Sequence, residues 1–542
     1  MASEYLFILQ RNSKVQTMKQ YKLLFLVCVA SLLLASCRES HTPHIKIVCT
    51  SDVHGHLFPT DFLTGDSARG SLARVSSYLK EQRRQGTGVV YIDNGDMLQG
   101  TPATYCYNTY AVGHPHVAAE ALNYLACDAV VLGNNDIEPG GPTYQRYINT
   151  LNAQTIGANI VYKDTEDPFL PPYTIVEREG VKIAVLGLTT PAIPHWIPKC
   201  QWPELEFVDM ETSARRWVQY LREHENPDLI IGLFHSGYEG GIVTDSYAEN
   251  ATRVVAERVP GFDAIFYGHD HQARTTEVVN VEGDTVLLLN PGKKAYNVAT
   301  LDIVRAKEGG FTLSTALVDM DAYAPDEEYM ATFAPHIERI DKYLNRVIGT
   351  SAHPYDTLCD FIHKMQLDIS GAKVSFAATH MQGGLIPEGD VTVRDIYRYC
   401  PYENTLYVLW LTGHEIKNYL ELSYDRWLTY LADQEANEHF DSAAGIIYEV
   451  NRTRPIGKRV TIRHMADGTP FNPDQRYMVA MNSFRAHGGG GLMPLGAGIT
   501  HEQLQERIVY STTADLRFYM INYIEMRKTV TPERLNHWTF VR

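Results

Sequence analysis

The sequence contains few cysteines and no closely spaced pair of them. Eight occur among 542 residues, and no C-x-x-C pattern is present. This absence excludes zinc ribbons and thioredoxin-like redox motifs. Two of the eight lie before residue 40, and the other six are scattered: Cys49, Cys106, Cys127, Cys200, Cys359 and Cys400. An exported protein permits disulfides among such residues, but we expect buried free thiols because no pairing stands out.

Long apolar runs are missing as well. The run from Leu23 to Leu34 holds about twelve residues, whereas a membrane-spanning helix needs roughly 20. It follows Lys19 and Lys22 and ends in a small-residue sequence, Leu-Ala-Ser, directly before Cys37. Residues 1–37 thus resemble a bacterial lipoprotein signal peptide, in which Cys37 becomes the lipidated first residue. We therefore predict an exported lipoprotein, held by its lipid on the periplasmic or cell-surface side of a membrane.

Basic residues are outnumbered by acidic ones. The chain has 48 Lys and Arg against 64 Asp and Glu, a net charge of -16, and removal of residues 1–36 takes four of the former and one of the latter. So acidic a surface repels polymeric nucleic acid, whose binding needs clustered Lys and Arg. Small phosphorylated substrates stay possible where bound cations reverse the local field.

The chain is long enough for two or three domains, and its first part alternates strands with helices. Expected strands are 45–50, 89–92, 129–132, 181–188, 228–234 and 264–267; expected helices are 71–84, 116–126, 143–151, 210–223 and 247–258. This alternation predicts an α/β domain with a buried sheet. Strands expected at 275–281, 285–289, 295–304 and 311–318 have no helices between them, so we expect them to form a second, antiparallel sheet.

A charged helical segment and a second domain follow. Residues 324–347 carry apolar side chains at helical spacing, and we expect this segment to connect the domains while its apolar stripe packs on one of them. The remainder predicts an α+β domain, with helices at 358–370, 393–399, 413–432 and 512–526 and strands at 374–377, 406–411, 446–450, 459–463 and 477–481. We find neither internal repeats nor low-complexity tracts.

Polar side chains with metal-binding atoms occur at the ends of five predicted strands. These candidate ligands are Asp52, His54, Asp96, Asn134, His235, His269 and His271. Asp52 and His54 are two residues apart, so their side chains point to the same side of the strand. Seven oxygen and nitrogen ligands without a thiolate favour Mn, Zn or Fe. Two such cations about 3.5 to 4 Å apart bind phosphoryl oxygens and acidify a water molecule, which suits phosphoester hydrolysis.

Each of these residues also has a structural explanation. Gly133-Asn134-Asn135 is a common turn sequence, because Asn tolerates left-handed backbone angles, and single histidines are often surface residues. The ordered set of five segments outweighs that explanation. We predict that Asn134 is a metal ligand, and that Asp136 belongs to the turn.

The five segments resemble the motifs of a known family. Asp52-x-His54, Gly95-Asp96, Gly133-Asn134, His235 and Gly268-His269-x-His271 are similar to those of the calcineurin-like metallophosphoesterases, in the 5'-nucleotidase branch. This resemblance implies a layered α/β domain with two mixed sheets (43–320), a linker helix (321–348) and a substrate-binding α+β domain (349–542). It also implies two metal ions: Asp52, His54, Asp96 and His271 would hold one, and Asp96, Asn134, His235 and His269 the other.

The C-terminal domain resembles the family less closely. The resemblance implies a substrate-binding set of Phe440, Asn482, Phe484, Gly488 and Gly489, with Phe440 as one of two rings that enclose a base. Leu492 stands where the family has the second ring. The family's substrate-binding arginine is also missing near Gln382–Ile386, and Arg394, Arg398 or Arg485 could replace it or could be ordinary surface charges.

The largest departure from the family is at Asn135. The family has a catalytic histidine there, oriented by a carboxylate three residues later, and that position is kept as Glu138. Asparagine donates a hydrogen bond but delivers no proton, and general acid catalysis contributes about 10²- to 10⁴-fold in rate. We therefore predict a slower enzyme, affected most with poor leaving groups. His56, His114 and His116 are alternatives for the missing group.

The sequence thus predicts a lipid-anchored, dinuclear-metal phosphoesterase that acts on nucleotides or related small phosphoesters. A 2',3'-cyclic phosphodiesterase or UDP-sugar hydrolase is the alternative within that class. From another class, a metal-dependent nucleotide-binding lipoprotein without turnover is also open, because Asn135, the missing arginine and Leu492 favour it.

Overall fold

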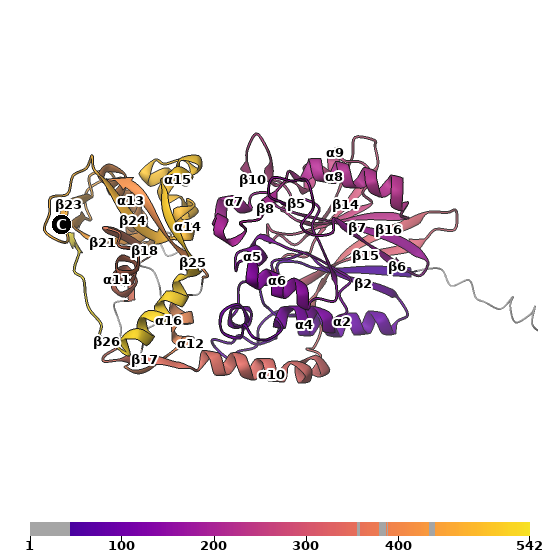
Figure 1. The fold of residues 1–542 in the computed structure, drawn as a ribbon, viewed down its shortest axis with the longest axis horizontal. Helices are drawn as coiled ribbons and strands as arrows, with labels where there is room; N and C mark the ends of the chain where they lie inside the picture. Colours follow the sequence, from indigo (N-terminus) through magenta and orange to yellow (C-terminus); the bar gives the residue numbers. More distant parts are fainter. Residues whose placement is uncertain (1–43, 355–357, 379–385, 387, 401, 433–439) are drawn as a thin grey trace, which may run out of the picture.

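The computed structural model describes residues 44–354, 358–378, 386, 388–400, 402–432 and 440–542. The chain forms an N-terminal and a C-terminal lobe, and one long helix, α10, runs along an edge of the N-terminal lobe (Figure 1). The predicted signal peptide with Cys37, and the segment around Gln382, lie outside the described residues. Within those residues, no helix is both long and apolar enough to span a membrane.

Two six-stranded mixed sheets form the N-terminal lobe. The first has the spatial order β16 (Phe311–Asp319), β15 (Asn297–Arg305), β1 (His44–Thr50), β2 (Gly88–Asp93), β3 (Ala129–Val131) and β4 (Gln154–Ile156). The second has β13 (Arg274–Val279), β14 (Thr285–Asn290), β12 (Ala264–Tyr267), β9 (Leu229–His235), β7 (Val181–Thr189) and β6 (Tyr173–Arg178). The predicted α/β domain with two mixed sheets is confirmed.

The two sheets face each other, and helices cover their outer sides (Figure 1). Ile47, Val90, Ile183 and Ile231 are among the fully buried residues between the sheets. The first sheet packs against α2 (Leu72–Arg84), α4 (Val117–Tyr124) and α6 (Gly141–Thr150), and the second against α8 (Met210–Tyr220) and α9 (Thr252–Arg258). Strands buried on both faces read as continuous Val and Ile runs, as in this sequence.

The expected separate antiparallel sheet is wrong. β13 and β14 extend the second sheet, whereas β15 and β16 extend the first, where β15 pairs antiparallel with β1. In that register Ile45 lies opposite Ile303 and Ile47 opposite Leu301. The four strands therefore complete both existing sheets, a choice of partner that alternating apolar residues alone do not encode.

Two expected helices begin later than predicted. Residues 248–250 form β11, which pairs with β10 (Gly240–Val243), and α9 starts at Thr252. Near the C-terminus β25 runs to Asp515, whose side chain accepts a hydrogen bond from the Phe518 backbone N–H and so caps α16. The capping residue, rather than the apolar pattern, fixes that helix start.

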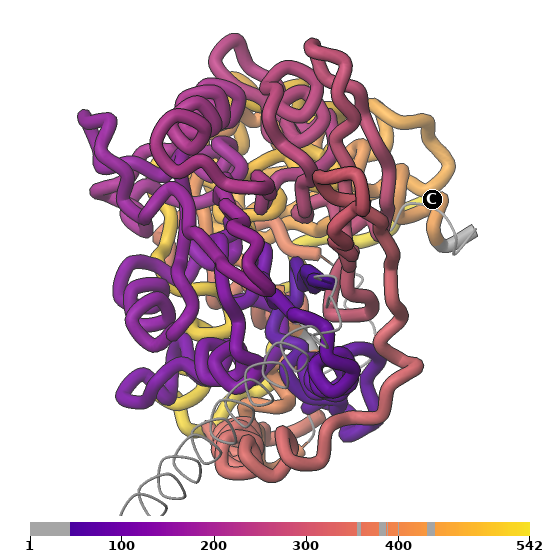
Figure 2. Tube along the Cα trace, turned by 90° about the vertical axis from the view of Figure 1, so that its right-hand side faces the viewer, coloured from indigo at the N-terminus to yellow at the C-terminus, as the bar shows by residue number. Residues whose placement is uncertain are grey.

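The connecting helix α10 spans Glu327–Leu344. The Asp326 side chain caps its first turn, and Phe333 packs near Phe58 and Tyr124 of the N-terminal lobe. Seen from the N-terminal side, α10 lies along the lower edge, with the C-terminal lobe behind (Figure 2). Its apolar stripe thus packs on a domain, as expected.

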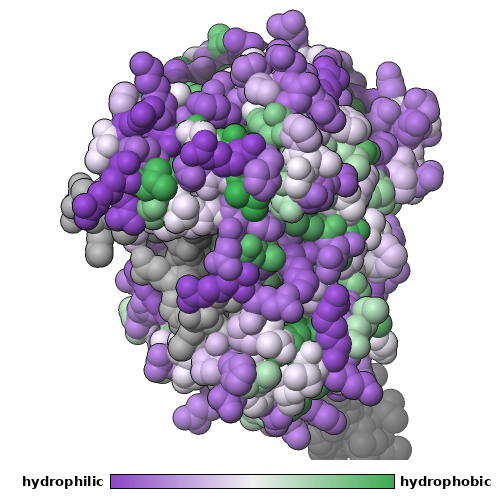
Figure 3. Space-filling model, turned by 90° about the vertical axis from the view of Figure 1, so that its left-hand side faces the viewer, coloured by the Kyte–Doolittle hydropathy of each residue, from purple (hydrophilic) through white to green (hydrophobic). Residues whose placement is uncertain are grey.

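The C-terminal lobe combines three sheets with six α-helices among the described residues. A five-stranded sheet has the order β21 (Asp441–Ala444), β18 (Val374–Ala378), β24 (Arg476–Asn482), β20 (Thr405–Thr412) and β25 (Ile508–Asp515). Smaller sheets are β23-β22-β27 (Val460–Met465, Ile446–Asn451, Trp538–Val541) and β19-β17-β26 (Gly389–Thr392, Val347–Ser351, Thr529–Val530). The helices are α11 (Leu358–Ser370), α12 (Val393–Tyr399), α13 (Gly413–Ala432), α14 (Ser483–Ala486), α15 (His501–Arg507) and α16 (Leu516–Arg527). On the outer side of this lobe, hydrophobic side chains form small separate groups among hydrophilic ones (Figure 3).

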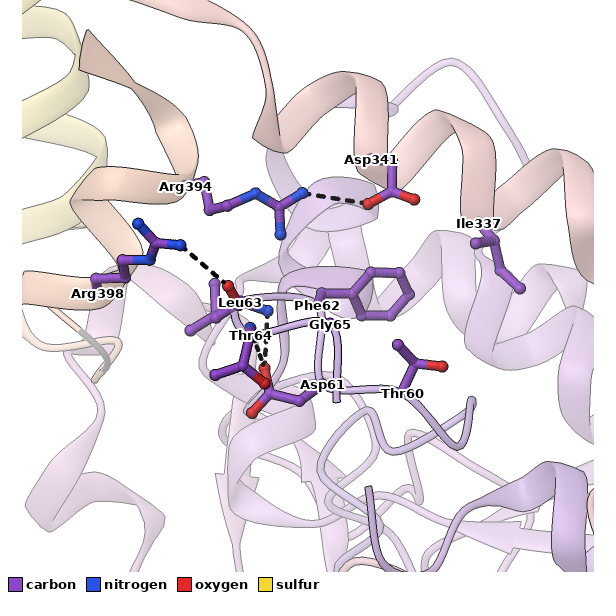
Figure 4. Close-up of a pocket in the computed structure, with 10 residues that line it drawn as sticks. All are labelled: Thr60, Asp61, Phe62, Leu63, Thr64, Gly65, Ile337, Asp341, Arg394 and Arg398. Carbon is purple, nitrogen blue, oxygen red and sulfur yellow. Dashed lines mark hydrogen bonds and ion pairs between the residues drawn. The ribbon is translucent and has the colours of Figure 1, made fainter. Parts of the chain in front are cut away.

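The lobes meet at a joint made by the loop 60–65, α10 and α12 (Figure 4). It lines an open cavity of about 340 Å³. Arg394 of α12 lies 3.3 Å from a carboxylate oxygen of Asp341 on α10, and Arg398 donates to the Leu63 carbonyl at 3.4 Å. Both arginines thus join the two lobes, and the cavity lining contains none of the predicted metal ligands.

Candidate active site

The predicted ligands come from the carboxyl ends of strands in both sheets. In the first sheet, Asp52 follows β1, Asp96 follows β2 and Asn134 follows β3. In the second, His235 ends β9, and His269 and His271 follow β12. Parallel strands place these ends at one edge, where open α/β sheets bind ligands.

The ligands form two groups that could each hold a cation. Asp52, His54 and His271 make one, and Asp96, His235 and His269 the other, with the ligand atoms of each group within 4.8 Å of one another. Asn134 joins the second group, because its Oδ1 lies 3.3 Å from His235 Nε2. The structure therefore brings together all seven predicted ligands.

The backbone at this edge is unusual. Asp52, His54, Asp96, His269 and His271 all have positive φ, between 48° and 69°. A left-handed conformation is uncommon for residues other than glycine and tends to occur at functional sites. The turns are held so that their side chains converge.

Two glycines, which have no side chain, provide the room that the ligand side chains occupy. A Cβ on Gly133 would lie 2.2 Å from Asp96 Oδ1 and 2.7 Å from His235 Nε2, and a Cβ on Gly268 would lie 2.5 Å from Asp52 Oδ2. Any side chain at these positions would collide with the ligand set. Both glycines belong to the motifs seen in the sequence.

Hydrogen bonds fix the rings of His54 and His235 so that the second ring nitrogen of each faces the site. His54 Nδ1 lies 3.1 Å from the Gln99 carbonyl and His235 Nδ1 2.7 Å from the Asn94 carbonyl. A carbonyl requires a donor, so in the neutral rings Nε2 is the acceptor. His54 Nε2 lies 3.0 Å from His271 Nε2, and His235 Nε2 lies 3.3 Å from Asp96 Oδ2. Ring nitrogens and a carboxylate oxygen at such distances fit bound cations once the ring nitrogens are deprotonated, and the carbonyls fix the ring orientations.

Family models match both parts of the chain. A calcineurin-like phosphoesterase model matches residues 45–273, and a 5'-nucleotidase C-terminal domain model matches residues 337–496. The chain belongs to the 5'-nucleotidase branch of the calcineurin-like phosphoesterases. It is accordingly a metal-dependent phosphoric ester hydrolase by family, as the sequence predicted.

The individual relatives have low sequence identity to this chain, but they align with most of it. The trifunctional nucleotide phosphoesterase YfkN of Bacillus subtilis is 24% identical over 95% of this chain, which spans 40% of YfkN. The 2',3'-cyclic-nucleotide 2'-phosphodiesterase/3'-nucleotidase of Haemophilus influenzae is 24% identical, with 92% of this chain and 87% of that protein covered. A 5'-nucleotidase-like structure from Staphylococcus aureus has the same fold, with a TM-score of 0.69, 22% identity, and 90% and 100% coverage.

Charge at the centre of the phosphoesterase site is concentrated on Asp96. Burial opposes its ionisation, but His235 keeps the pKa of Asp96 below its ordinary value. Burial likewise opposes protonation of His235, yet Asp96 raises the pKa of His235 to about 10. A cation bound at His235 Nε2 would displace that proton, so metal binding should release protons.

Asp136 braces the two turns that carry Asp96 and Asn134. Its carboxylate accepts hydrogen bonds from the backbone N–H groups of Gly133, Asp96, Met97 and Leu98, at 2.8 to 2.9 Å. The sequence placed Asp136 in a turn, and the structure adds that this buried side chain links β2 to β3.

We expect Asp136→Asn to lower the free energy of unfolding by about 2 to 4 kcal/mol, because an amide accepts at one oxygen and leaves buried N–H groups unpaired. Urea denaturation measures this effect, with the exposed Asp167→Asn as control. Metal affinity should fall in parallel. An Asp136→Asn protein as stable as the parent would contradict the brace.

Asn135 contacts Asp96, the residue predicted to bind both cations. Its backbone N–H donates to Asp96 Oδ1 at 2.7 Å, and its Nδ2 donates to Asp96 Oδ2 at 2.8 Å. Glu138 accepts a hydrogen bond from Gln99, and burial, then Glu403 and Asp96, raise the pKa of Glu138 to about 8. Asn135 thus orients Asp96, while Glu138 lines a cavity of about 210 Å³ between the lobes. Their catalytic roles stay predictions.

Two of the three alternative histidines are placed where they do not serve the site. His116 is fully buried, where it caps α4 and contacts Asn108, and His114 is exposed. Burial lowers the pKa of the half-buried His56 to about 4. Two of the three are therefore bound to structural roles or face solvent.

The predicted substrate-binding residues differ in exposure. Phe440 is 2% exposed and its ring stacks on Trp427 at 5.3 Å, whereas Phe484 is 42% exposed. A Cβ on Gly489 would lie 2.5 Å from the Phe484 ring, so the absence of a side chain at Gly489 leaves room for that ring beside the loop. Phe484 is therefore the more accessible ring, and the role of both rings stays a prediction.

The rest of this loop is built by capping and by a buried ion pair. Asn482 accepts from the Arg485 backbone N–H and so caps α14, and Gly488 has a φ of 87°. Arg485 is buried against Asp441, 2.9 Å away, which leaves it in the core of the domain. It does not supply the missing substrate arginine at the surface.

Two neighbours of His269 were not predicted from the sequence. Glu249 lies 3.1 Å from its Nε2, and the Trp196 ring lies 5.6 Å from its ring. Glu249 was hidden because residues 247–258 were assigned to a helix. Trp196 belongs to the short helix α7 (Ile193–Trp196), which has no metal-binding pattern.

A pair of histidines bridges the lobes beside this site. His195 Nδ1 of α7 lies 2.9 Å from His501 Nε2 of α15. Burial and then His501 lower the pKa of His195, and Glu249, Glu502 and His487 face the pair. The bond requires at least one neutral ring, because two imidazolium groups would repel each other.

We expect acidification to weaken the docking of the lobes. Because the pKa of His195 is depressed in the docked form, its contribution is present above the ordinary histidine range and is lost as pH falls below about 6.5. The radius of gyration from small-angle scattering should rise between pH 7.5 and 5. His501→Gln should reduce that change, whereas the exposed His224→Gln should leave it intact; an equal response in both would contradict this role.

Proposed function

We propose that the protein hydrolyses phosphate esters of nucleotides and related small molecules at a site for two divalent cations. The observation that carries this proposal is the convergence of seven oxygen and nitrogen ligands in two adjacent groups. Bound at these groups, two cations would polarise the phosphoryl oxygens and acidify a water molecule.

The chain's own residues would orient this chemistry. Asp96 would contribute its carboxylate to the cation positions and is itself held by Asn135 and by the Asp136 brace. His54 and His235 are fixed by backbone carbonyls. Phosphoryl transfer depends largely on positioning and charge stabilisation, which such a rigid set provides.

A nucleotide substrate is supported by the C-terminal lobe. Phe484 presents an exposed ring on a glycine-rich loop, and a stacked base would gain about 0.5 to 1.5 kcal/mol beyond its buried area. The relatives from Bacillus subtilis and Haemophilus influenzae are named for nucleotide substrates.

Within this class, cyclic phosphates and other good leaving groups are a second candidate. Asn135 donates its backbone N–H and one of its two side-chain N–H groups to Asp96, and an amide has no acidic proton to transfer to a leaving group. Substrates with stable leaving groups need that proton least. A UDP-sugar hydrolase would satisfy the same condition.

The test is phosphate release by purified protein that has been stripped of metal and reloaded with Mn, Zn or Co. The substrates are AMP, ATP, UDP-glucose, 2',3'-cyclic AMP and an aryl phosphate. We expect metal-dependent turnover, faster on the cyclic and aryl esters than on AMP. Nucleotide binding without turnover on any of the five would instead favour a nucleotide-binding lipoprotein.

We also propose lipid attachment at Cys37 and export to the periplasmic or cell-surface side of a membrane. The basic, apolar and small-residue order of residues 19–37 supports it. Cells grown with labelled palmitate should label the parent protein and not Cys37→Ala. Equal labelling of both would overturn the proposal.

A further inference from the structure

A carboxylate outside the two ligand groups contacts one of the predicted ligands. Glu249 Oε1 is 3.1 Å from His269 Nε2, and both side chains are largely buried. Among the described residues, Glu249 belongs to neither group of converging ligand atoms. It therefore contacts the ligand rather than the cation position.

This contact makes His269 differ from two other ring ligands. His54 and His235 place Nδ1 on backbone carbonyls, which leaves Nε2 to face the site. His269 places Nε2 on a carboxylate, so Nε2 carries the proton and Nδ1 is left for a cation. Such carboxylate–histidine pairs fix the tautomer and increase the basicity of a metal ligand.

The β10–β11 hairpin is built around this carboxylate. Glu249 Oε2 accepts from the Ile242 N–H at 2.6 Å, and a Cβ on Gly241 would lie 2.4 Å from the same oxygen. The Glu249 carbonyl accepts from the hydroxyls of Thr190 and Ser236, which follow β7 and β9. The side chain is thus anchored at both ends and has one oxygen left for His269.

We propose that Glu249 is a positioning residue. It fixes the tautomer of His269 so that Nδ1 is free to bind a cation in the group with Asp96 and His235. The inference rests on the proposed two-cation function and deepens it. The seven ligands include two carboxylates, Asp52 and Asp96, against the four positive charges of two divalent cations. Glu249 adds a third negative charge next to the ligand group that contains His269. It adds no charge next to the group that contains His54.

The predicted result is an unequal loss of the two cations. Glu249→Ala should weaken one Mn²⁺ site by about 10- to 100-fold and leave the other unchanged. Isothermal titration of metal-free protein with Mn²⁺, and the metal content after gel filtration, measure this directly. Glu249→Gln, which keeps a hydrogen-bond acceptor but loses the charge, should fall between the parent and Glu249→Ala.

The matched control is Glu239→Ala. Glu239 lies just before the same hairpin and pairs with Arg253 at the surface, so its removal should leave both affinities unchanged. Thermal unfolding of each metal-free variant identifies any that fails to fold, in which case Glu249→Gln alone provides the test.

Two results would overturn the proposal. Parent-like affinities for both cations in Glu249→Ala would show that His269 needs no partner. An equal weakening of both sites would show a general structural role. Because metal binding is measured without substrate, a parent protein that binds two cations but hydrolyses nothing would sink the proposed function and leave this inference standing.

Discussion

Asp96→Ala should lower kcat/KM for phosphate release by at least about 10³-fold, roughly 4 kcal/mol of transition-state stabilisation. Asp96 lies in the group with His235 and His269, and it also acts electrostatically on His54 of the other group. Its loss removes the carboxylate that can bridge the two cations, and it leaves the buried His235 without its charged partner.

Metal content distinguishes this explanation from simple unfolding. Asp96→Ala should bind fewer than two cations per chain, and Asp96→Asn, which keeps one amide oxygen, should lose less activity. The exposed Asp167→Ala serves as control. An Asp96→Ala protein with two bound cations and more than about a tenth of parent activity would contradict the bridging role, since the missing carboxylate would then contribute under about 1.4 kcal/mol.

Asn135→His should raise turnover on AMP relative to turnover on an aryl phosphate by about tenfold or more. An imidazole at this position could protonate an alkoxide leaving group, which an aryl oxide does not need. The gain should stay below the full range of general acid catalysis, because the substitution also removes the bond from Asn135 Nδ2 to Asp96.

The ratio of the two substrates is the informative quantity. Any general effect on the cation site changes both rates together, whereas proton delivery changes only the AMP rate. Asn135→Ala provides the control, since it removes the same bond to Asp96 without adding an acid. An unchanged ratio in Asn135→His would refute the role assigned to position 135.

Much of the catalytic lobe was predictable from sequence for a physical reason. Parallel strands buried on both faces appear as dense Val and Ile runs, and their carboxyl ends are marked by glycine followed by Asp, Asn or His. Local sequence therefore revealed Asp96 and Asn134, because each lies directly beyond its own strand. The structure then placed these ligands at one edge of the sheets, because the strands that carry them run parallel.

What sequence did not reveal depends on contacts between distant segments. The pairing of β15 with β1 joins residues about 250 positions apart, and alternating apolar residues fit several partners equally. Glu249 was not predicted because its role depends on its contact with His269, which lies in a different segment of the chain. Phe440 matches a family position. Its burial, however, depends on a tertiary contact with Trp427 of α13, which the local sequence does not encode.

The positive φ angles at five ligands limit which residues can occupy these positions without backbone strain. Asn, Asp and His are the non-glycine residues that tolerate the left-handed region best, and they are also good ligands for borderline divalent cations. Replacement of Asp52 by Glu or of His271 by Gln would therefore meet two obstacles, a misplaced ligand atom and a disfavoured backbone. The same turns that concentrate the ligands therefore favour Asn, Asp or His at these positions.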